Sequence, residues 1–287
     1  MFGIHVHKGK YKTTADAIKA SNVWSVNESK KSNIIPTVQI YTHGPRGYNT
    51  VNIGKDEIIK LINDTSLQVY VHSTYYSIPW KGSEKALLHI NEQYKICEEI
   101  GAKGLVLHLP KNTPEIVAKF VPNHPNVQTI LEMTSVKPDD RKSYESPEKL
   151  NNLIDILENA GAKNYGICID TSHIWAAGQN VKSKAFMDDY FSKLKYPHKI
   201  VLIHLNGSSI PLNGHKDTHI IPFTKDDKIW SGTPYNKSGV SSVVDFCKLW
   251  NIPIIMEINR GEDEEVKGIY KVLVKHFTNN SPSTRKK

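Results

Sequence analysis

The chain has 287 residues and a formal net charge of +8 at pH 7, from 37 Lys and Arg against 29 Asp and Glu. No stretch approaches the roughly 20 apolar residues that span a bilayer, and the N-terminal segment lacks the apolar core of a secretory signal. We therefore expect a soluble, intracellular protein with no secretory signal and no membrane partner. The mild excess of positive charge favours a polyanionic partner such as nucleic acid only weakly, because many housekeeping enzymes are mildly basic.

The three cysteines are Cys97, Cys168 and Cys247, and they lie far apart in segments of helix or strand character. An odd number at such spacing argues against a disulfide framework and against a thiolate metal site. We expect them to be small buried residues.

Apolar segments of strand length recur along the chain, and residue types that bind metals end most of them. The expected strands, in chain order, are Phe2–His7, Ile35–Tyr41, Leu67–His72, Gly104–His108, Val127–Glu132, Tyr165–Asp170, Ile200–His204 and Pro253–Glu257. From the third strand onward, each ends on His, Glu or Asp. Because a buried strand end does not tolerate an unpaired charge, this pattern predicts that the six ends line one metal site.

Segments of helical length and periodicity alternate with these strands. Three clear examples are Glu84–Ile100, Ser146–Ala160 and Ser241–Leu249. Ser83, Ser146 with Pro147, and Ser241 with Ser242 are typical of helix starts, and Gly101 and Gly161 are typical of left-handed helix ends. Alternating strands and helices predict a parallel sheet.

Eight strands in a chain of this length fit a single (β/α)8 barrel. A barrel brings the C-terminal ends of all its strands to one face, whereas an open doubly wound sheet would spread them along a line. We expect the barrel to occupy residues 1–277, with the metal site at the C-terminal face of the strands. Residues 278–287 are expected to form a basic, disordered tail.

Carboxylates provide the strongest individual candidates for the site. Glu132 and Glu257 end apolar segments, where a carboxylate would be costly to bury unless it is paired or bound to a cation. Asp170 ends another such segment, and the turn after it can bring His173 back over the same face, so that one loop supplies two ligands. The alternative is an Asp that caps the next helix, followed by a surface His.

Histidines supply most of the other candidates. A lone His at a strand end is more often a satisfied core residue than a ligand, but His72, His108 and His204 occupy equivalent ends, which favours a shared site. In Asp217-Thr218-His219 the spacing places two side chains on one side of an extended segment, although two solvated side chains would also explain this motif on its own. We interpret the other histidines as supporting, surface or packing residues: His5 and His7 beside the site, and His89, His124, His198 and His276 elsewhere.

Together these segments resemble endonuclease IV, the apurinic/apyrimidinic (AP) endonuclease with a TIM barrel and three zinc ions. The resemblance runs in order from Phe2 to Phe277, and its most specific part is Asp170 to Gly178. The segments that carry it are Tyr70-Val71-His72, Leu107-His108, Leu131-Glu132-Met133, Gly166 to Gly178, His204-Leu205-Asn206, Asp217-Thr218-His219 and Met256-Glu257.

The resemblance implies three divalent metal ions and nine protein ligands. One metal would be held by His72, His108 and Glu132, a second by Glu132, Asp170, His204 and Glu257, and the third by His173, Asp217 and His219. Zinc is the implied metal, with manganese an alternative at part of the site, because His and carboxylate ligands accept both. Glu132 would be the catalytic residue, since it bridges two metals and positions the metal-bound hydroxide.

The resemblance also implies the reaction and the partner. The expected activity is hydrolysis of the phosphodiester bond 5′ to an abasic site in double-stranded DNA, which leaves a 3′-hydroxyl and a 5′-deoxyribose phosphate, by a monomer in a DNA-containing compartment. Members of the family insert side chains into DNA at the lesion, and Arg46, Tyr75 and Tyr76 occupy the corresponding positions. An ordinary turn and two surface aromatics are the alternative for these three residues.

The sequence departs from the family pattern at three places. Ser172 replaces a Cys between Thr171 and His173, and Gly207 stands where an Asp commonly follows Asn206. A Gly-rich stretch expected after His219 is replaced by Ile220–Phe223. The first two changes spare the ligands, whereas the third alters a loop that bears on substrate preference.

Two other classes of protein compete with the endonuclease. A sugar isomerase or epimerase on the same barrel would use a single metal held by Glu132, Asp170, His204 and Glu257, and fold alone does not separate it from the endonuclease. It has no evident use for the five further candidate ligands. A nonenzymatic DNA-binding module would need none of the nine.

Overall fold

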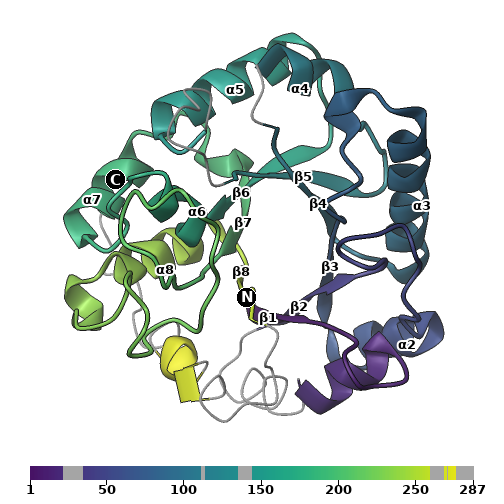
Figure 1. Ribbon diagram of the computed structural model, residues 1–287, viewed down its shortest axis with the longest axis horizontal. Helices are drawn as coiled ribbons and strands as arrows, with labels where there is room; N and C mark the ends of the chain where they lie inside the picture. The colour runs from purple at the N-terminus through teal and green to yellow at the C-terminus, as the bar shows by residue number, and fades with distance from the viewer. Residues whose placement is uncertain (22–34, 111–113, 135–143, 259–267, 270, 276–287) are drawn as a thin grey trace.

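Eight parallel strands close into a barrel, with neighbours paired in chain order and the eighth strand paired with the first (Figure 1). The computed structural model describes residues 1–21, 35–110, 114–134, 144–258, 268–269 and 271–275. The strands are β1 (Phe2–Val6), β2 (Pro36–Tyr41), β3 (Gln68–His72), β4 (Gly104–His108), β5 (Gln128–Glu132), β6 (Tyr165–Asp170), β7 (Ile200–His204) and β8 (Ile254–Met256). The predicted single (β/α)8 TIM barrel is confirmed, with every expected strand present. His276 and the tail predicted at residues 278–287 lie outside the described residues.

Six strand side chains fill the barrel interior just below its C-terminal mouth. They form a buried cluster separate from the main core: Tyr70, Val106, Ile130, Cys168, Leu202 and Ile255. Each stands two residues before a His, Glu or Asp at the strand end. Because side chains on a strand alternate between its two faces, these polar residues face the same interior side as the apolar layer. The period of two therefore directs six candidate ligands into the mouth.

Helices surround the ring of strands and cover its outer face (Figure 1). They are α2 (Lys55–Thr65), α3 (Glu84–Ile100), α4 (Pro114–Phe120), α5 (Pro147–Asn159), α6 (Thr171–Ala176), α7 (Lys184–Ser192) and α8 (Gly239–Trp250), with 3-10 turns η1 (Pro79–Lys81), η2 (Pro197–Lys199) and η3 (Tyr235–Lys237). Residues 14–21 are also helical. The main apolar core lies between these helices and the strands.

Helix ends follow the sequence signals at two helices and depart from them at a third. The Ser146 hydroxyl caps α5 by accepting a hydrogen bond from the Lys149 amide, and Gly101 ends α3 with a φ of 69°. The predicted start of α8 at Ser241 and Ser242 is wrong. The helix begins at Gly239, because the hydroxyl of Ser238 is the one that accepts from a first-turn amide, that of Val240. Ser241 instead donates its hydroxyl to the carbonyl of Ser238 at 2.8 Å.

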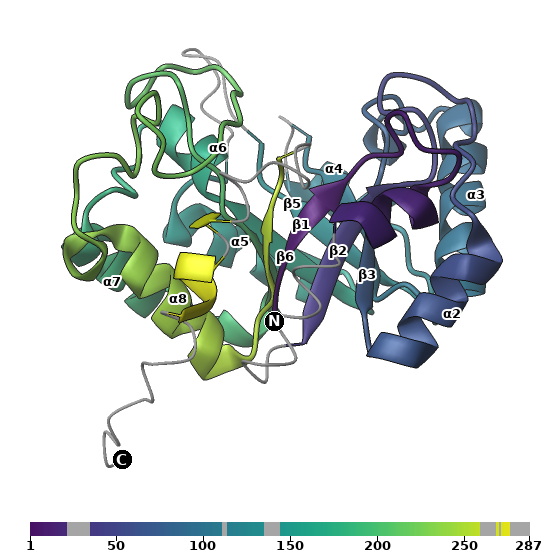
Figure 2. The same cartoon turned by 90° about the horizontal axis from the view of Figure 1, so that it is seen from below.

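The two ends of the barrel carry different structures. In Figure 2 the loops that join β6 to α7 and β7 to α8 rise above one end, whereas the N-terminus lies towards the other. Backbone connections after the C-terminal strand ends therefore surround the mouth in which the candidate ligands lie. This is the end where (β/α)8 barrels carry their functional sites.

All three cysteines are free and buried, as predicted. Among the described residues, no helix combines the length and the apolar character needed to cross a membrane.

Candidate metal centre

Three groups of side chains at the barrel mouth have the composition and spacing of metal sites. Within each group the ligand atoms lie no more than 4.8 Å apart. The groups are His72, His108 and Glu132; Glu132, Asp170, His204 and Glu257; and Asp170, His173 and His219. Glu132 and Asp170 each belong to two groups, so the three form one continuous centre.

The first group lies at the ends of β3, β4 and β5. His72 Nε2 and His108 Nε2 are each 3.0 Å from the same oxygen of Glu132, Oε2. The other ring nitrogen of His72 donates to the carbonyl of Ser73 at 2.7 Å. Since that bond fixes the ring, Nε2 faces the carboxylate. A His that ligates a metal is oriented in this way, through its second nitrogen.

The second group lies across β5, β6, β7 and the residue after β8. His204 Nδ1 is 3.1 Å from Glu132 Oε1 and 3.1 Å from Glu257 Oε2. Its Nε2 donates to the side-chain oxygen of Gln39 at 2.9 Å. The lone pair of His204 that is free for a metal therefore points at the two carboxylates.

Asp170 serves both as a helix cap and as a member of the centre. Its Oδ1 accepts from the amides of Ser172 and His173 at 2.6 and 3.0 Å, so it caps α6. Its Oδ2 lies 3.7 Å from His204 Nδ1 and 3.6 Å from His219 Nε2. The two interpretations that the sequence left open are thus compatible, and His173 is buried, not on the surface.

The third group combines α6 with the loop after β7. His173 Nδ1 donates to the carbonyl of Met133 at 2.6 Å, while its Nε2 lies 3.3 Å from Asp217 Oδ1. His219 Nε2 lies 3.0 Å from the same oxygen. Among the described residues, neither Nε2 atom has a hydrogen bond of normal geometry, although both are buried. Two buried nitrogens converge here without a satisfied partner.

Opposite charges compensate one another at the centre. Burial disfavours a charged Glu132, but two neighbouring histidines outweigh it and hold the pKa of Glu132 well below its usual value. Burial also disfavours a charged His173, yet Asp170 and Asp217 raise the pKa of that ring well above 6.5. The pKa of His219 rises to about 9 for the same reason. Protons therefore neutralise the carboxylates when no ion is bound, and a metal has to displace them.

Two buried amides complete the centre, and the sequence analysis assigned them no role. Gln39 donates from Nε2 to Glu257 Oε1 at 2.7 Å, besides accepting from His204. Asn206 donates to Asp170 Oδ2 at 2.7 Å and accepts from the backbone amide of Glu257 at 2.9 Å. The sequence does indicate a special role for Gln39, because it is a polar residue inside an apolar strand.

His5 and His7 stand beside this centre, as the sequence analysis proposed. His5 is buried, pairs in the sheet register with Gln39, and has Nδ1 3.6 Å from Glu257 Oε1. His7 packs its ring on that of His5, with centroids 4.6 Å apart. Neither belongs to a group with metal-site geometry in the part of the chain that is described.

The three residues proposed to contact DNA lie beside the first group. Arg46, Tyr75 and Tyr76 are all exposed. The amide of Tyr75 donates to the carbonyl of Pro45 at 3.0 Å, which brings the two loops together. The Tyr75 ring lies 5.2 Å from that of His108, centroid to centroid. The structure thus brings these three candidates to the rim of the centre.

The loop after β7 has its own closure at the positions that depart from the family pattern. Gly207 and Ile220 form an isolated antiparallel bridge. The buried carboxylate of Asp227 packs against Gly207, where an added Cβ would stand 2.9 Å from it. Asp227 also accepts hydrogen bonds from the amides of Ser208, Phe223, Ile229 and Trp230. A carboxylate from the far end of the loop thus fills the space beside Gly207.

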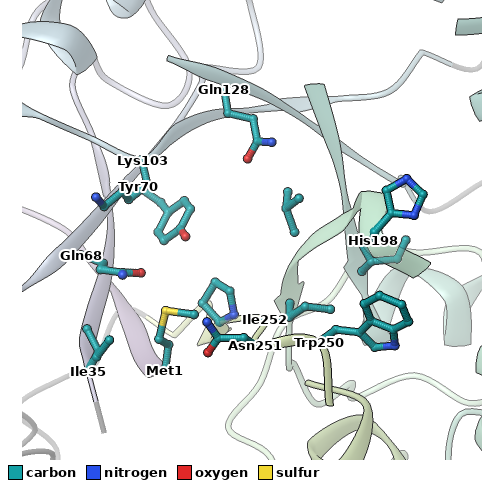
Figure 3. Close-up of a pocket in the computed structure, with 13 residues that line it drawn as sticks. Met1, Ile35, Gln68, Tyr70, Lys103, Gln128, His198, Trp250, Asn251 and Ile252 are labelled. Atoms are coloured by element: carbon teal, nitrogen blue, oxygen red, sulfur yellow. The ribbon is translucent and has the colours of Figure 1, made fainter. Parts of the chain in front are cut away.

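A cavity of about 420 Å³ lies at the opposite end of the barrel (Figure 3). Its lining includes the strand starts Gln68, Gln128 and Ile200, together with His198. No carboxylate lines it. It lacks a set of metal ligands, and the candidate centre therefore stays at the C-terminal mouth.

Comparison with known proteins agrees with this geometry. Residues 35–231 match the family model described as the xylose isomerase-like TIM barrel. A "Probable AP endonuclease" of African swine fever virus (isolate Tick/Malawi/Lil 20-1/1983) is 28% identical over 244 residues, which cover 80% of this chain and 81% of the relative. A "Probable endonuclease 4" of Mycoplasmopsis pulmonis (strain UAB CTIP) is 27% identical over 81% of this chain and 86% of the relative.

Solved structures show the same relationship. The crystal structure of AsfvAP:AG superimposes with a TM-score of 0.79 at 27% identity and covers 97% of both chains. The model match spans more than half of the sequence, and the relatives agree in kind. The chain therefore belongs to the xylose isomerase-like TIM barrel family, as a member of its AP endonuclease and endonuclease IV group.

Proposed function

We propose that this protein is a metal-dependent AP endonuclease that hydrolyses the phosphodiester bond 5′ to an abasic site in double-stranded DNA. The observation that carries the proposal is the convergence at the barrel mouth of the histidines and carboxylates that the endonuclease IV resemblance requires. Similarity to the viral "Probable AP endonuclease" along 80% of the chain supports the same activity. The expected products are a 3′-hydroxyl and a 5′-deoxyribose phosphate.

The donor set fits three divalent ions. The unpartnered Nε2 atoms of His173 and His219 are buried beside Asp217, as a shared cation would require. We assign the ions to three sets of ligands: His72, His108 and Glu132; Glu132, Asp170, His204 and Glu257; and His173, Asp217 and His219. Zinc suits these ligands, with manganese an alternative at part of the centre. When bound, such ions supply Lewis acidity towards the phosphate and a water activated near neutral pH.

The protein's own residues hold and orient this chemistry. Glu132 lies between the first and second groups, so its two oxygens fix the histidines of both. Gln39 and Asn206 each donate to an oxygen of Glu257, at 2.7 and 3.2 Å, and so keep its carboxylate from rotating away. Positions fixed in this way keep the reacting groups in register, which is a large part of catalysis in such sites.

The rim residues fit binding of damaged DNA. Arg46, Tyr75 and Tyr76 are exposed, and the ring of Tyr75 lies next to His108 of the first group. An abasic site lacks pairing and stacking, so wedge residues open it at a cost of only a few kcal/mol. Recognition would rest on deformability more than on base contacts, by a protein that acts as a monomer.

The sugar isomerase alternative accounts for only part of the centre. Its single metal would occupy the second group and leave the buried His173 and the half-buried His219 without a purpose. The same is true of His72 and His108. A nonenzymatic DNA-binding module explains even less, because buried charged groups are costly unless they have a use.

Cleavage of a labelled duplex with one tetrahydrofuran abasic analogue tests the proposal. The analogue cannot undergo β-elimination, so incision requires hydrolysis. We expect a 3′-hydroxyl product from zinc-loaded protein and an intact duplex after chelation. A duplex left intact by fully metal-loaded protein, or bound without cleavage, would overturn the proposal, and turnover of a ketose or aldose would favour the isomerase.

A further inference from the structure

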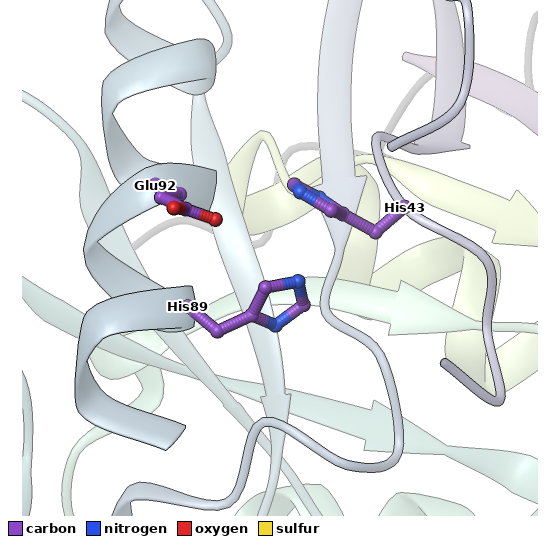
Figure 4. A group of neighbouring side chains, drawn as sticks. All are labelled: His43, His89 and Glu92. Atoms are coloured by element: carbon purple, nitrogen blue, oxygen red, sulfur yellow. The ribbon is translucent and has the colours of Figure 1, made fainter. Parts of the chain in front are cut away.

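A second place in the structure has the composition of a metal site, and it lies apart from the centre at the mouth. His43, just after β2, faces His89 and Glu92 of α3 (Figure 4). Their ligand atoms all lie within 4.8 Å of one another. His89 and Glu92 are three residues apart on one helix, so their side chains share a face. The loop and the helix thus bring two imidazoles and a carboxylate together.

His89 is fixed in an orientation that leaves one nitrogen free. Its ring is buried, and Nδ1 is hydrogen-bonded to the hydroxyl of Ser77. Ser77 also accepts from Gln93 Nε2 and pairs with the Thr74 hydroxyl, both at 3.0 Å. One arrangement that satisfies all three partners has Ser77 donating to Thr74 and accepting from His89 Nδ1, which leaves the lone pair of His89 on Nε2.

That Nε2 atom is buried and has no hydrogen bond of normal geometry within the described part of the chain. A buried polar atom without a partner is uncommon in native structures and calls for an unplaced water or ion. The ring of His43 lies against that of His89, with centroids 4.3 Å apart and planes at 74°. The ring of His89 therefore packs against a second imidazole, not an apolar wall.

The orientation of His43 matches that of His89. His43 is buried, and its Nδ1 lies 3.0 Å from the hydroxyl of Thr42. A hydrogen bond from one imidazole nitrogen to a neighbouring group is the usual arrangement behind a metal ligand.

We propose that His43, His89 and Glu92 form a fourth metal site, which binds a divalent transition ion of the zinc type. Two imidazoles favour zinc over magnesium or calcium, which select oxygen ligands. Three protein ligands leave one of the four positions of zinc to water, as in zinc sites that keep an open position. The ion would fasten the segment after β2 to α3.

The segment fastened in this way carries Arg46 and Tyr48. The Tyr48 ring lies 4.8 Å from that of His89, centroid to centroid, and Lys85 Nζ of α3 lies over the Tyr48 ring, 4.3 Å from its centroid. Ordering this segment would hold the rim beside Tyr76, whose ring is 6.1 Å from that of Tyr48. The site does not depend on the reaction at the mouth and stands or falls separately from it.

Zinc counting in matched variants of the full chain tests the site. Glu92→Gln removes an exposed ligand without disturbing the core, and Glu84→Gln changes an exposed carboxylate in the first turn of the same helix as the control. Each protein is stripped, titrated with zinc against a chromophoric chelator, and scored for ions per chain. We expect Glu92→Gln to bind one ion fewer than the parent, and Glu84→Gln to match the parent.

A second variant and a second readout guard against loss of folding. His43→Asn is expected to lose the same ion, while its circular dichroism shows that the barrel remains. Titration with cobalt(II) is expected to lose the same share of visible absorption in both variants. Equal zinc and cobalt binding by the parent and Glu92→Gln would overturn the proposal and leave the trio as a packed cluster. Because the comparison counts a difference between variants, it holds whether or not DNA is cleaved.

Discussion

Replacing Gln39 by Leu removes a carboxamide on β2 that contacts two residues of the metal centre. Gln39 is fully buried, and its side chain contacts His204 at 2.9 Å and Glu257 at 2.7 Å. Leucine has a similar volume and can make neither bond. Two buried polar atoms lose their partner, and each such loss costs about 1–3 kcal/mol. We expect the free energy of unfolding of the metal-free protein to fall by at least about 2 kcal/mol.

The metal should be affected as well as the fold. Partners that orient a ligand typically contribute roughly 10- to 100-fold in metal affinity. We therefore expect the Kd of the ion held by His204 and Glu257 to rise by about that factor, measured by zinc competition with a chelator. Gln128→Leu, at the opposite end of the barrel, is the control. A Kd for Gln39→Leu within twofold of the parent would refute the reasoning, because it would show that His204 and Glu257 are oriented without the amide.

Three further outcomes are expected. Glu132→Gln should lose more bound zinc than any other single ligand change. It should also lower the incision rate by more than the roughly 100-fold that loss of an orienting partner costs. Full activity with full metal content would contradict the position of Glu132 between two groups. Zinc binding near pH 7 should release protons, because the pKa of His219 is about 9 without metal. The raised pKa of His219 stabilises the metal-free fold fully below pH 6.5, and this stabilisation is lost as the pH rises through 9. Fewer protons then compete with zinc, so zinc affinity should increase from pH 6.5 to 9. Calorimetry in two buffers of different ionisation enthalpy measures the release, and equal heats would argue against it. Burial raises the pKa of the Cys168 thiol to about 12, so iodoacetamide at pH 8 should label no cysteine until the chain unfolds; labelling of native protein would show that the interior layer opens.

The barrel could be predicted from the sequence because two local signals agreed. The strands are short apolar runs, and each of the six candidate ligands at the strand ends stands two positions after an interior residue, as Glu132 does after Ile130. A period of two survives any tertiary context, since it is set by the backbone. Helix starts were less certain, because Ser238 and Ser241 are both plausible caps and only packing decides between them.

Contacts of residues outside the strand-end pattern could not be predicted. The sequence gives no hint that Gln39 reaches His204, because the amide acts through a side-chain orientation that appears only when β2 closes against the barrel. His89 was interpreted as a surface or packing residue, yet it is buried with a free nitrogen. Its partner His43 is 46 positions away in sequence and on another element. Such pairs depend on the fold as a whole.

The loop after β7 is closed at its base by its own hydrogen bonds. The shape of the loop base is therefore separate from the identity of the exposed residues above it. The bridge between Gly207 and Ile220 and the four amide contacts of Asp227 tie the base of the loop to itself. Within this loop the amides of Asn213 and His215 also bond to the carbonyls of Trp175 and Ala176, so the backbone of the loop is held against α6. Exposed side chains of the loop, such as Leu212, are therefore the place where substitutions could retune which DNA is accepted, while the barrel and its two strand-held groups keep their shape.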